Sequence, residues 1–187
     1  MKKWECQKSE LILNRKYFKV KKDTVKLPTN EIKKWIYWDS KDSVMVIGIT
    51  KDGKLIMIKQ YRYLVGSEVI EFPSGGIHDN ESIKKAAKRE FEEESGFKCG
   101  SLVKLGSFYE TYGQLNRKIH IFFSNNITRS KQNLDNGERG FEDIKVEFVD
   151  FEEAVKLASE NKILAMGSSL AVLLLKEKIK RKEMMIN

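Results

Sequence analysis

Glu90, Glu93 and Glu94 form a tight acidic cluster within a segment of helical character. Residues three and four apart share one face of an α-helix, so these carboxylates would converge on one small volume. Like charges packed this closely repel one another, and a cation would relieve the repulsion. Mg²⁺ prefers carboxylate oxygens and usually keeps several waters, which suits it to handling phosphate groups. On spacing alone, a magnesium site and a solvated acidic helix face fit equally well.

The residues on both sides of the cluster favour the first interpretation. Residues 75–97 read GGIHDNESIKKAAKREFEEESGF. Gly75 is followed after five residues by Glu81, and after seven more by the run that begins at Arg89. This pattern resembles the signature box of the Nudix hydrolases at every defining position. A match at so many fixed positions is far more specific than a single Gly-rich triplet.

The box also contains the parts of a well-formed helix. Asp79 or Asn80 can cap its start, and Gly96 can end it in a left-handed conformation. Arg89 follows Glu81 by eight residues, about two helical turns, so the two lie on a similar face. We therefore expect Arg89 to hold carboxylates in place.

Composition indicates a compact enzyme. The chain has 187 residues, enough for one domain with a substantial core and a small extension. Its hydrophobic content of 41% and its 2 prolines argue against disorder. No apolar run approaches the roughly 20 residues that span a bilayer, and the basic start lacks the apolar stretch of a signal peptide. We expect a cytoplasmic protein with no membrane partner, whose two isolated cysteines form neither a disulfide nor a metal site.

The net charge of +8 raises the question of nucleic acid binding. The lysines are scattered, and the one dense basic cluster, in residues 176–182, continues a helix with an apolar face. No basic stripe interleaved with aromatic residues suits a single strand. We expect no nucleic acid partner, and the basic excess would instead concentrate anionic phosphate substrates.

Apolar runs bounded by turn residues predict strands at 10–38 (broken at 26–30), 44–49, 55–59, 69–72, 102–108, 118–123 and 144–149. The segment Lys51-Asp52-Gly53 is a hairpin signal between two of them. Helices are predicted in the box, at about 152–160 and at 168–183. Strands, a helix, further strands and then helices, with mixed connections, indicate an α/β sandwich.

The resemblance extends well beyond the box. Gln60–Arg62 and Glu71–Gly76 are similar to the segment that precedes the box in ADP-ribose pyrophosphatases and related nucleoside-diphosphate-sugar hydrolases. Residues 142–146 and 162–169 are similar to the tail of the same subfamily, and residues 17–28 to its N-terminal sheet. Together these segments cover nearly the whole chain.

The resemblance implies a fold of the α/β class, the Nudix fold. A mixed β-sheet would be sandwiched between α-helices, with a small N-terminal antiparallel sheet beside it. Residues 1–40 would form that sheet as an extension used in dimerisation, and residues 41–187 would form the hydrolase domain. The first 40 residues are rich in aromatic side chains that so small a sheet cannot bury alone. We therefore expect a homodimer, in which, as in the subfamily, active sites are completed across the interface.

Metal binding is also implied by the resemblance. The matching positions are the backbone carbonyl of Ser74 and the side chains of Glu90, Glu93, Glu94 and Glu142. Mg²⁺ is the expected cofactor, with Mn²⁺ as an alternative.

Three residues are expected to take part in catalysis. Glu93 stands beside the metal positions, and Arg89 orients the carboxylates around it. Glu142 matches an acidic position on a loop and would take the proton of the attacking water as general base, or Glu138 would do so instead.

Substrate contacts are expected from four residues. Arg62 matches a basic residue aimed at the diphosphate, although a surface arginine capping a strand would look the same, and Glu71 belongs to the same matching segment. Tyr17 and Trp35 fall where related enzymes place rings that sandwich the base, and stacking on a flat ring gives affinity with little base choice. Trp35 could instead belong to the core of the small sheet or to a dimer interface.

The function implied is magnesium-dependent hydrolysis of the diphosphate in a nucleoside diphosphate sugar. ADP-ribose, for example, would yield AMP and ribose 5-phosphate. Two positions depart from the subfamily: Tyr112 replaces a proline, and Gly140 stands where some members have a second acidic residue. Tyr112 favours an alternative, a dinucleoside polyphosphate or nucleoside triphosphate hydrolase. A sensor that binds a nucleotide sugar without cleaving it is disfavoured, because such sensors commonly lose the box carboxylates that this chain retains.

Overall fold

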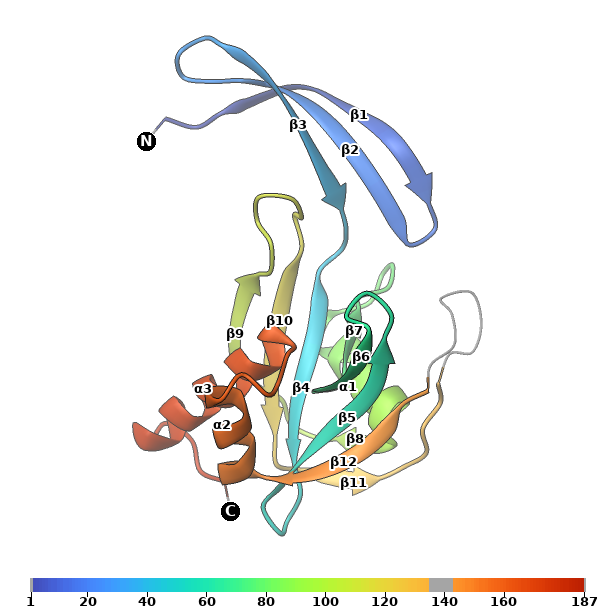
Figure 1. Cartoon of the computed structure of the whole chain (residues 1–187), viewed down its shortest axis with the longest axis vertical. Coiled ribbons are helices and arrows are strands. Elements are labelled where there is room, and N and C mark those ends of the chain that lie inside the picture. The colour runs from blue at the N-terminus through green and yellow to red at the C-terminus, as the bar shows by residue number, and fades with distance from the viewer. Residues whose placement is uncertain (1, 135–142, 187) are drawn as a thin grey trace. The chain divides into compact units, whose positions relative to one another are not determined.

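The structure is a computed structural model that describes residues 2–134 and 143–186. The chain divides into two compact units, one of residues 1–42 and 109–118 and the other of residues 43–108 and 119–187 (Figure 1). The smaller unit contains the N-terminal sheet, and the larger one contains the box.

The smaller unit is a three-stranded antiparallel sheet. Its strands are β1 (Glu5–Arg15), β2 (Phe18–Lys26) and β3 (Ile32–Asp39), in the order β1-β2-β3. The loop of residues 109–118 packs on the end of β3, where the Trp38 N–H donates to the Gln114 carbonyl at 2.8 Å and Asn116 Nδ2 donates to Asp39 Oδ1 at 2.7 Å. The smaller unit therefore includes a piece of chain that comes from far along the sequence.

The larger unit is built on a seven-stranded mixed sheet. Its strands are β4 (Ser43–Ile49), β5 (Lys54–Arg62), β6 (Ser67–Glu71), β7 (Ser74–Gly76), β9 (Val103–Tyr109), β10 (Lys118–Ser124) and β12 (Lys145–Asp150). The order is β12-β5-β4-β10-β9, with β6 paired to β5 and β7 paired to β4. Strands β4 and β10 run parallel, whereas β5 is antiparallel to β4, β6 and β12. A separate pair joins β8 (Phe97–Cys99) to β11 (Ile127–Arg129).

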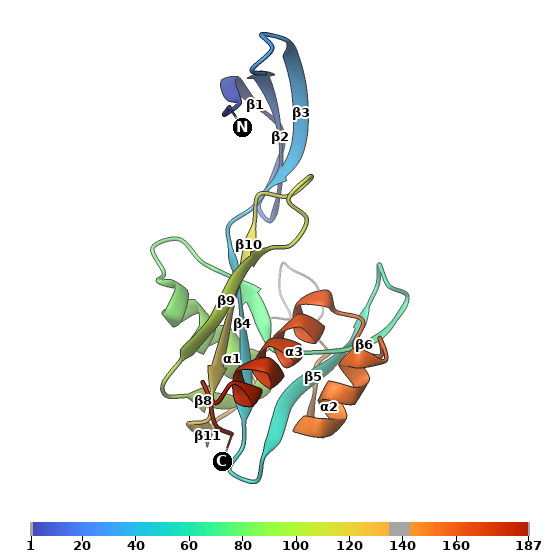
Figure 2. The ribbon, with the colours of Figure 1, turned by 90° about the vertical axis from the view of Figure 1, so that its left-hand side faces the viewer.

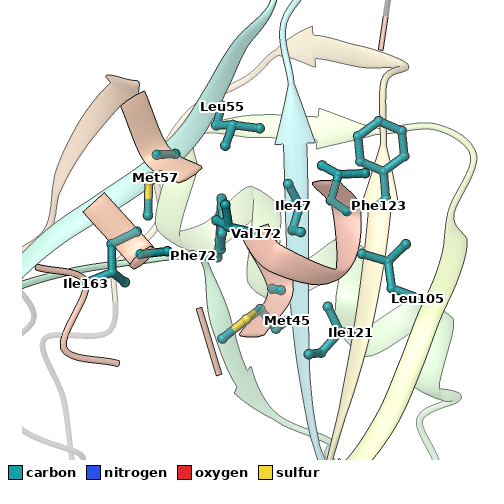
Figure 3. Packing of buried hydrophobic residues seen from close by; sticks show 14 of the residues in the cluster. Met45, Ile47, Leu55, Met57, Phe72, Leu105, Ile121, Phe123, Ile163 and Val172 are labelled. Carbon is teal, nitrogen blue, oxygen red and sulfur yellow. The ribbon is translucent and has the colours of Figure 1, made fainter. Parts of the chain in front are cut away.

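Helices cover both faces of this sheet. Figure 2 shows α1 (Ile83–Ser95) on one face and α2 (Phe151–Ser159) with α3 (Met166–Lys180) on the other. Strand β4 is buried along its whole length, and its side chains alternate between the two faces. Met45 and Ile47 pack with α2 and α3, as Figure 3 shows, whereas Val44 and Val46 pack with α1. The two hydrophobic clusters hold the three layers together.

The predicted mixed sheet between helices, with a small antiparallel N-terminal sheet, is confirmed. The hairpin signal at residues 51–53 is also confirmed, with Gly53 at a φ of 81°. The last two helices differ slightly from their expected ranges, since α2 covers Phe151–Ser159 and α3 covers Met166–Lys180. Among the described residues, no helix is long and apolar enough to cross a membrane.

Candidate active site

Helix α1 carries the acidic cluster and begins later than the sequence suggested. Its N-cap is Ser82, whose Oγ accepts a hydrogen bond from the Lys85 N–H at 3.3 Å, so the prediction of Asp79 or Asn80 as the cap is wrong. Asn80 lies in a left-handed turn at a φ of 60°, which the Glu81 side chain stabilises by accepting from the His78 N–H at 3.1 Å. The expected end of the helix is confirmed, with Gly96 left-handed at a φ of 71°.

Glu90 and Glu94 are the two buried carboxylates of the helix, and both face strand β7. Glu94 Oε2 accepts a hydrogen bond from the Ser74 N–H at 2.7 Å. The carboxylate of Glu90 lies against Gly75, where an added Cβ atom would stand only 2.2 Å from Glu90 Cδ. Their i, i+4 spacing puts both on one helix face, so two acidic groups meet one short stretch of backbone.

Arg89 organises the remaining carboxylates. It bonds both oxygens of Glu81, through Nε to Oε1 and Nη2 to Oε2, each at 2.9 Å. Its Nη1 lies 2.9 Å from Glu93 Oε2 and 2.9 Å from Glu90 Oε1, and its Nη2 also donates to the Gly76 carbonyl at 2.9 Å. The guanidinium therefore compensates three carboxylates and ties them to β7. The contact with Glu81 was expected from a two-turn helical spacing, but Glu81 precedes the N-cap Ser82 and reaches Arg89 from outside the helix.

The ion pair with Arg89 also fixes the charge state of Glu81. Its hydrogen bonds from Arg89 hold the pKa of Glu81 at about 2, below the usual 4.5, although burial acts in the opposite direction. The fork-like pairing keeps this carboxylate ionised at neutral pH and fixes the orientation of Arg89.

The donor set beside β7 fits a divalent metal ion. Hard cations prefer carboxylate and carbonyl oxygens, and Glu90, Glu94 and the backbone at Ser74 supply such atoms close together. In the described part of the chain, however, no three Asp, Glu, His or Cys side chains are grouped so that they could hold a metal ion. Glu93 contributes to the ion pairs of Arg89, with its side chain about one third exposed.

The two candidate general bases, Glu138 and Glu142, lie outside the described residues, as does Gly140. The segment that leads toward them is attached to the end of α1. Gln132 Nε2 donates to the Glu94 carbonyl at 2.6 Å, and the Asn133 N–H donates to the Glu93 carbonyl at 3.0 Å. The chain thus leaves the carboxylate-bearing turn of the helix immediately before residues 135–142.

Arg62 and Glu71 form an ion pair between β5 and β6. Arg62 Nε and Nη2 lie 2.8 Å and 2.6 Å from Glu71 Oε1, and Gln60 Nε2 donates to the same oxygen at 3.1 Å. Burial raises the pKa of Glu71, and the contacts with Arg62 and Gln60 only partly oppose that effect. The Arg62 side chain is 42% exposed, so it can reach an anion while Glu71 orients it.

Tyr17 and Trp35 both belong to the smaller unit, but this chain does not bring them together. Tyr17 lies in the β1–β2 turn beside Phe18, whereas Trp35 on β3 is opposite Asp23 of β2. Asp23 is five residues along β2 from Phe18, a separation of about 16 Å in an extended strand. Trp35 contacts Trp4 edge to face, with ring centroids 6.0 Å apart, and remains 42% exposed. One chain alone therefore cannot sandwich a base between these two rings.

Sequence reasoning missed several polar contacts around the carboxylates. Gln60 donates to Glu71, and Gln132 donates to the Glu94 and Ile144 carbonyls. Neither glutamine stands in a sequence pattern that marks it. The role of Gly75 could have been anticipated, because a glycine within a motif often marks a place where two groups approach closely. Only the structure identifies Glu90 as the group that approaches it.

Comparison with known proteins agrees with this geometry. A family model described as NUDIX domain matches residues 39–166. The chain is 28% identical over 165 residues to an ADP-ribose pyrophosphatase of Bacillus subtilis (strain 168), covering 87% of each chain. It is 29% identical over 177 residues to the methanol dehydrogenase activator of Bacillus methanolicus, covering 94% of this chain and 95% of the relative.

Two further proteins match this chain, one over about half of its length and the other over nearly all of it. The ADP-sugar pyrophosphatase of Mus musculus is 38% identical over 100 residues, which cover 48% of this chain and 46% of the mouse protein. A crystal structure of an ADP compounds hydrolase superposes with a TM-score of 0.80 over 97% of both chains, at 20% identity. That identity is low, so the structural match speaks for the fold alone.

Proposed function

The chain belongs to the Nudix family of hydrolases, and from that premise we propose that it hydrolyses the diphosphate bond of a nucleoside diphosphate sugar such as ADP-ribose. The observation that carries the proposal is the pair of buried carboxylates, Glu90 and Glu94, that meets the backbone of β7 at Ser74 and Gly75. The similarity to an ADP-ribose pyrophosphatase and to an ADP-sugar pyrophosphatase supports this class of substrate.

Nudix hydrolases generally use divalent metal ions, and we infer that Glu90, Glu94 and the Ser74 carbonyl hold Mg²⁺ or Mn²⁺ here. When bound, the ion supplies charge neutralisation for the diphosphate and a more acidic water. Arg89 keeps Glu81 ionised and holds both Glu81 and Glu93 in place around these ligands.

We assign the remaining steps to three other side chains and to the bound water. Glu142, or alternatively Glu138, takes a proton from the attacking water. Arg62, oriented by Glu71, presents positive charge to the diphosphate. The water oxygen forms a bond to one phosphorus, the bond from that phosphorus to the bridging oxygen breaks, and the other phosphate leaves. With ADP-ribose the products are AMP and ribose 5-phosphate.

A homodimer is part of the same proposal. Large apolar side chains are exposed on the N-terminal sheet, including Leu11 at 49%, Trp35 at 42% and Ile36 at 58%. So much apolar surface on one small sheet supports a protein partner. A base stacked between Tyr17 and Trp35 requires the two rings to come from different chains, because one chain holds them too far apart. A second copy of this chain supplies both the cover and the second ring.

Tyr112 favours a second substrate class, the dinucleoside polyphosphates or nucleoside triphosphates. Its side chain is 86% exposed, in the loop that packs on the N-terminal sheet, and so it is available to a ligand. A relative 29% identical to this chain is named a methanol dehydrogenase activator and not a pyrophosphatase. A screen that contains both nucleotide sugars and dinucleotides separates the two classes.

A substrate screen tests the proposal. The full-length protein, with Mg²⁺ or Mn²⁺, is incubated with ADP-ribose, other ADP-sugars, GDP-mannose, NAD, diadenosine polyphosphates and nucleoside triphosphates. Products are separated by chromatography, and reaction in ¹⁸O-water shows which phosphorus is attacked. Metal-dependent formation of AMP and ribose 5-phosphate, fastest with ADP-ribose, supports the proposal. Faster cleavage of a diadenosine polyphosphate would move the assignment to the alternative, and turnover of none of these compounds would overturn it.

A further inference from the structure

Strands β6 and β7 are two halves of one segment that changes its partner in the sheet. Glu71 ends β6 and is opposite Ile58 of β5, whereas Ser74 begins β7 and is opposite Met45 of β4. Only Phe72 and Pro73 lie between them. In those two residues the chain crosses from one partner strand to the other, and neither residue is paired in a strand ladder.

The crossover is held by one contact from β4, the partner strand of β7, and one from α3. The Pro73 carbonyl accepts a hydrogen bond from the Val46 N–H of β4 at 3.1 Å. The Phe72 N–H donates to Ser168 Oγ, in the first turn of α3, at 3.0 Å. Phe72 and Ser168 are both fully buried, at 0% exposure. Water therefore cannot substitute for the serine hydroxyl at this position.

The two sides of the crossover carry different parts of the candidate active site. On one side, the Glu71 carboxylate orients Arg62. On the other side, the Ser74 N–H donates to Glu94, and the Ser74 carbonyl is the backbone group assigned to the metal. A shift of the backbone at Phe72 would move both, because each is within two residues of it.

We propose that Ser168 is a positioning residue that fixes this crossover and thereby sets both the metal-binding backbone at Ser74 and the orientation of Glu71. The proposal rests on the proposed function for the roles of those two residues. Ser168 reaches neither substrate nor metal itself, and its hydroxyl is confined between the Phe72 N–H and the Met45 sulfur, 4.0 Å away. The buried Phe72 N–H has an acceptor only while it stays beside the Ser168 hydroxyl, so any shift of this backbone would leave the N–H unsatisfied and cost free energy.

The neighbouring serine provides a matched control. Ser169 Oγ donates to the Ile163 carbonyl at 2.8 Å, in the same turn of α3 but away from the crossover. S168A and S169A each remove one hydroxyl from the same helical turn. Only S168A leaves the Phe72 N–H without the acceptor that the structure gives it.

The test measures Mn²⁺ binding without substrate, by titration calorimetry of the full-length proteins, and amide exchange of the peptide that contains Phe72. For S168A we expect faster exchange of that peptide and Mn²⁺ binding weakened about tenfold, the loss typical of a residue that supports metal ligands. For S169A we expect both to match the parent protein. Thermal unfolding of each variant shows whether the change is local.

Equal Mn²⁺ affinity in S168A, S169A and the parent would overturn the proposal, as would an unchanged exchange rate for the Phe72 peptide. If S168A does not fold, S168C is measured instead. A cysteine has nearly the same volume as serine, and its sulfur is a weaker hydrogen-bond acceptor. We expect S168C to show the same faster exchange and weaker Mn²⁺ binding. A parent protein that binds Mn²⁺ but does not cleave ADP-ribose would count against the proposed function and leave this test intact.

Discussion

The carboxylate of Glu90 occupies the space where any side chain at position 75 would begin. A Cβ atom on Gly75 would lie 2.2 Å from Glu90 Cδ, whereas a Cβ atom on the adjacent Gly76 would meet nothing within 4 Å. The contact is with the far end of a flexible side chain, so Gly75→Ala would displace Glu90 and leave the sheet in place.

Gly75→Ala should therefore lower kcat by about 10²–10³, the loss typical of removing one electrostatic element of the transition state, while the protein still folds. Gly76→Ala is the matched control and should remain near the parent rate. The measurement is steady-state hydrolysis together with circular dichroism. Equal effects of the two substitutions would show that the Gly75–Glu90 contact does not matter for catalysis.

Glu94→Gln tests the charge at the β7 backbone. The amide oxygen can still accept from the Ser74 N–H, so the fold should survive. The lost negative charge should reduce kcat by about 10²–10³. KM should change far less, because substrate affinity also rests on Arg62 and on stacking.

Glu92→Gln is the control for that substitution. Glu92 lies on the same helix, but its Oε1 accepts from Ser130 Oγ at 2.7 Å, away from β7. Near-full activity of Glu94→Gln would show that Glu94 is not a metal ligand and would count against α1 as the metal-binding helix.

Acid should weaken the contribution of Glu81 to stability. The pKa of Glu81 is about 2 in the folded chain against a usual 4.5. A lowered folded pKa means that the ion pair stabilises the protein fully above pH 4.5 and that this stabilisation is lost as pH falls toward 2. The difference in unfolding free energy between the parent and Glu81→Gln, from urea melts, should therefore be largest at neutral pH and shrink below pH 4.5. A difference that stays constant with pH would contradict the assignment.

Trp35→Ala tests base stacking. Loss of one stacked ring should raise KM for ADP-ribose by the equivalent of about 1–2 kcal/mol. Lys34→Ala is the control, because Lys34 is exposed on the opposite face of the same strand. Light scattering of each variant reports its mass. If Trp35→Ala lowers the thermal midpoint and the dimer mass together, Trp35 is structural.

Local periodicity explains what could be inferred about the box helix. The spacing of Glu90 and Glu94 puts them on one face because every α-helix repeats in the same way. The pairing of Arg89 with Glu93, four residues further on, follows from the same repeat, and Gly96 ends the helix because a glycine adopts a left-handed φ at little cost. The class of fold was predictable for a similar reason, because the spacing of apolar residues within a short stretch of sequence distinguishes strands from helices.

The helix start could not be inferred with the same rules. Asp79, Asn80 and Ser82 are all acceptable caps, and their order in the sequence does not choose between them. The choice depends on Glu81, which is drawn to Arg89 and to the His78 N–H and so shapes residues 78–81 as a turn. Competition among these nearby polar groups therefore decides at which residue the helix begins.

The sequence by itself determined the box, the face on which its carboxylates lie and the layers of the fold, because these depend on neighbours within a few turns of chain. The tertiary structure alone decided which backbone those carboxylates meet. Ser168 and Phe72 are 96 residues apart, and residues 109–118 pack with the N-terminal sheet rather than with the sheet they interrupt. Such contacts arise when distant segments are buried together and their polar groups must find partners away from water, a condition that no local pattern records.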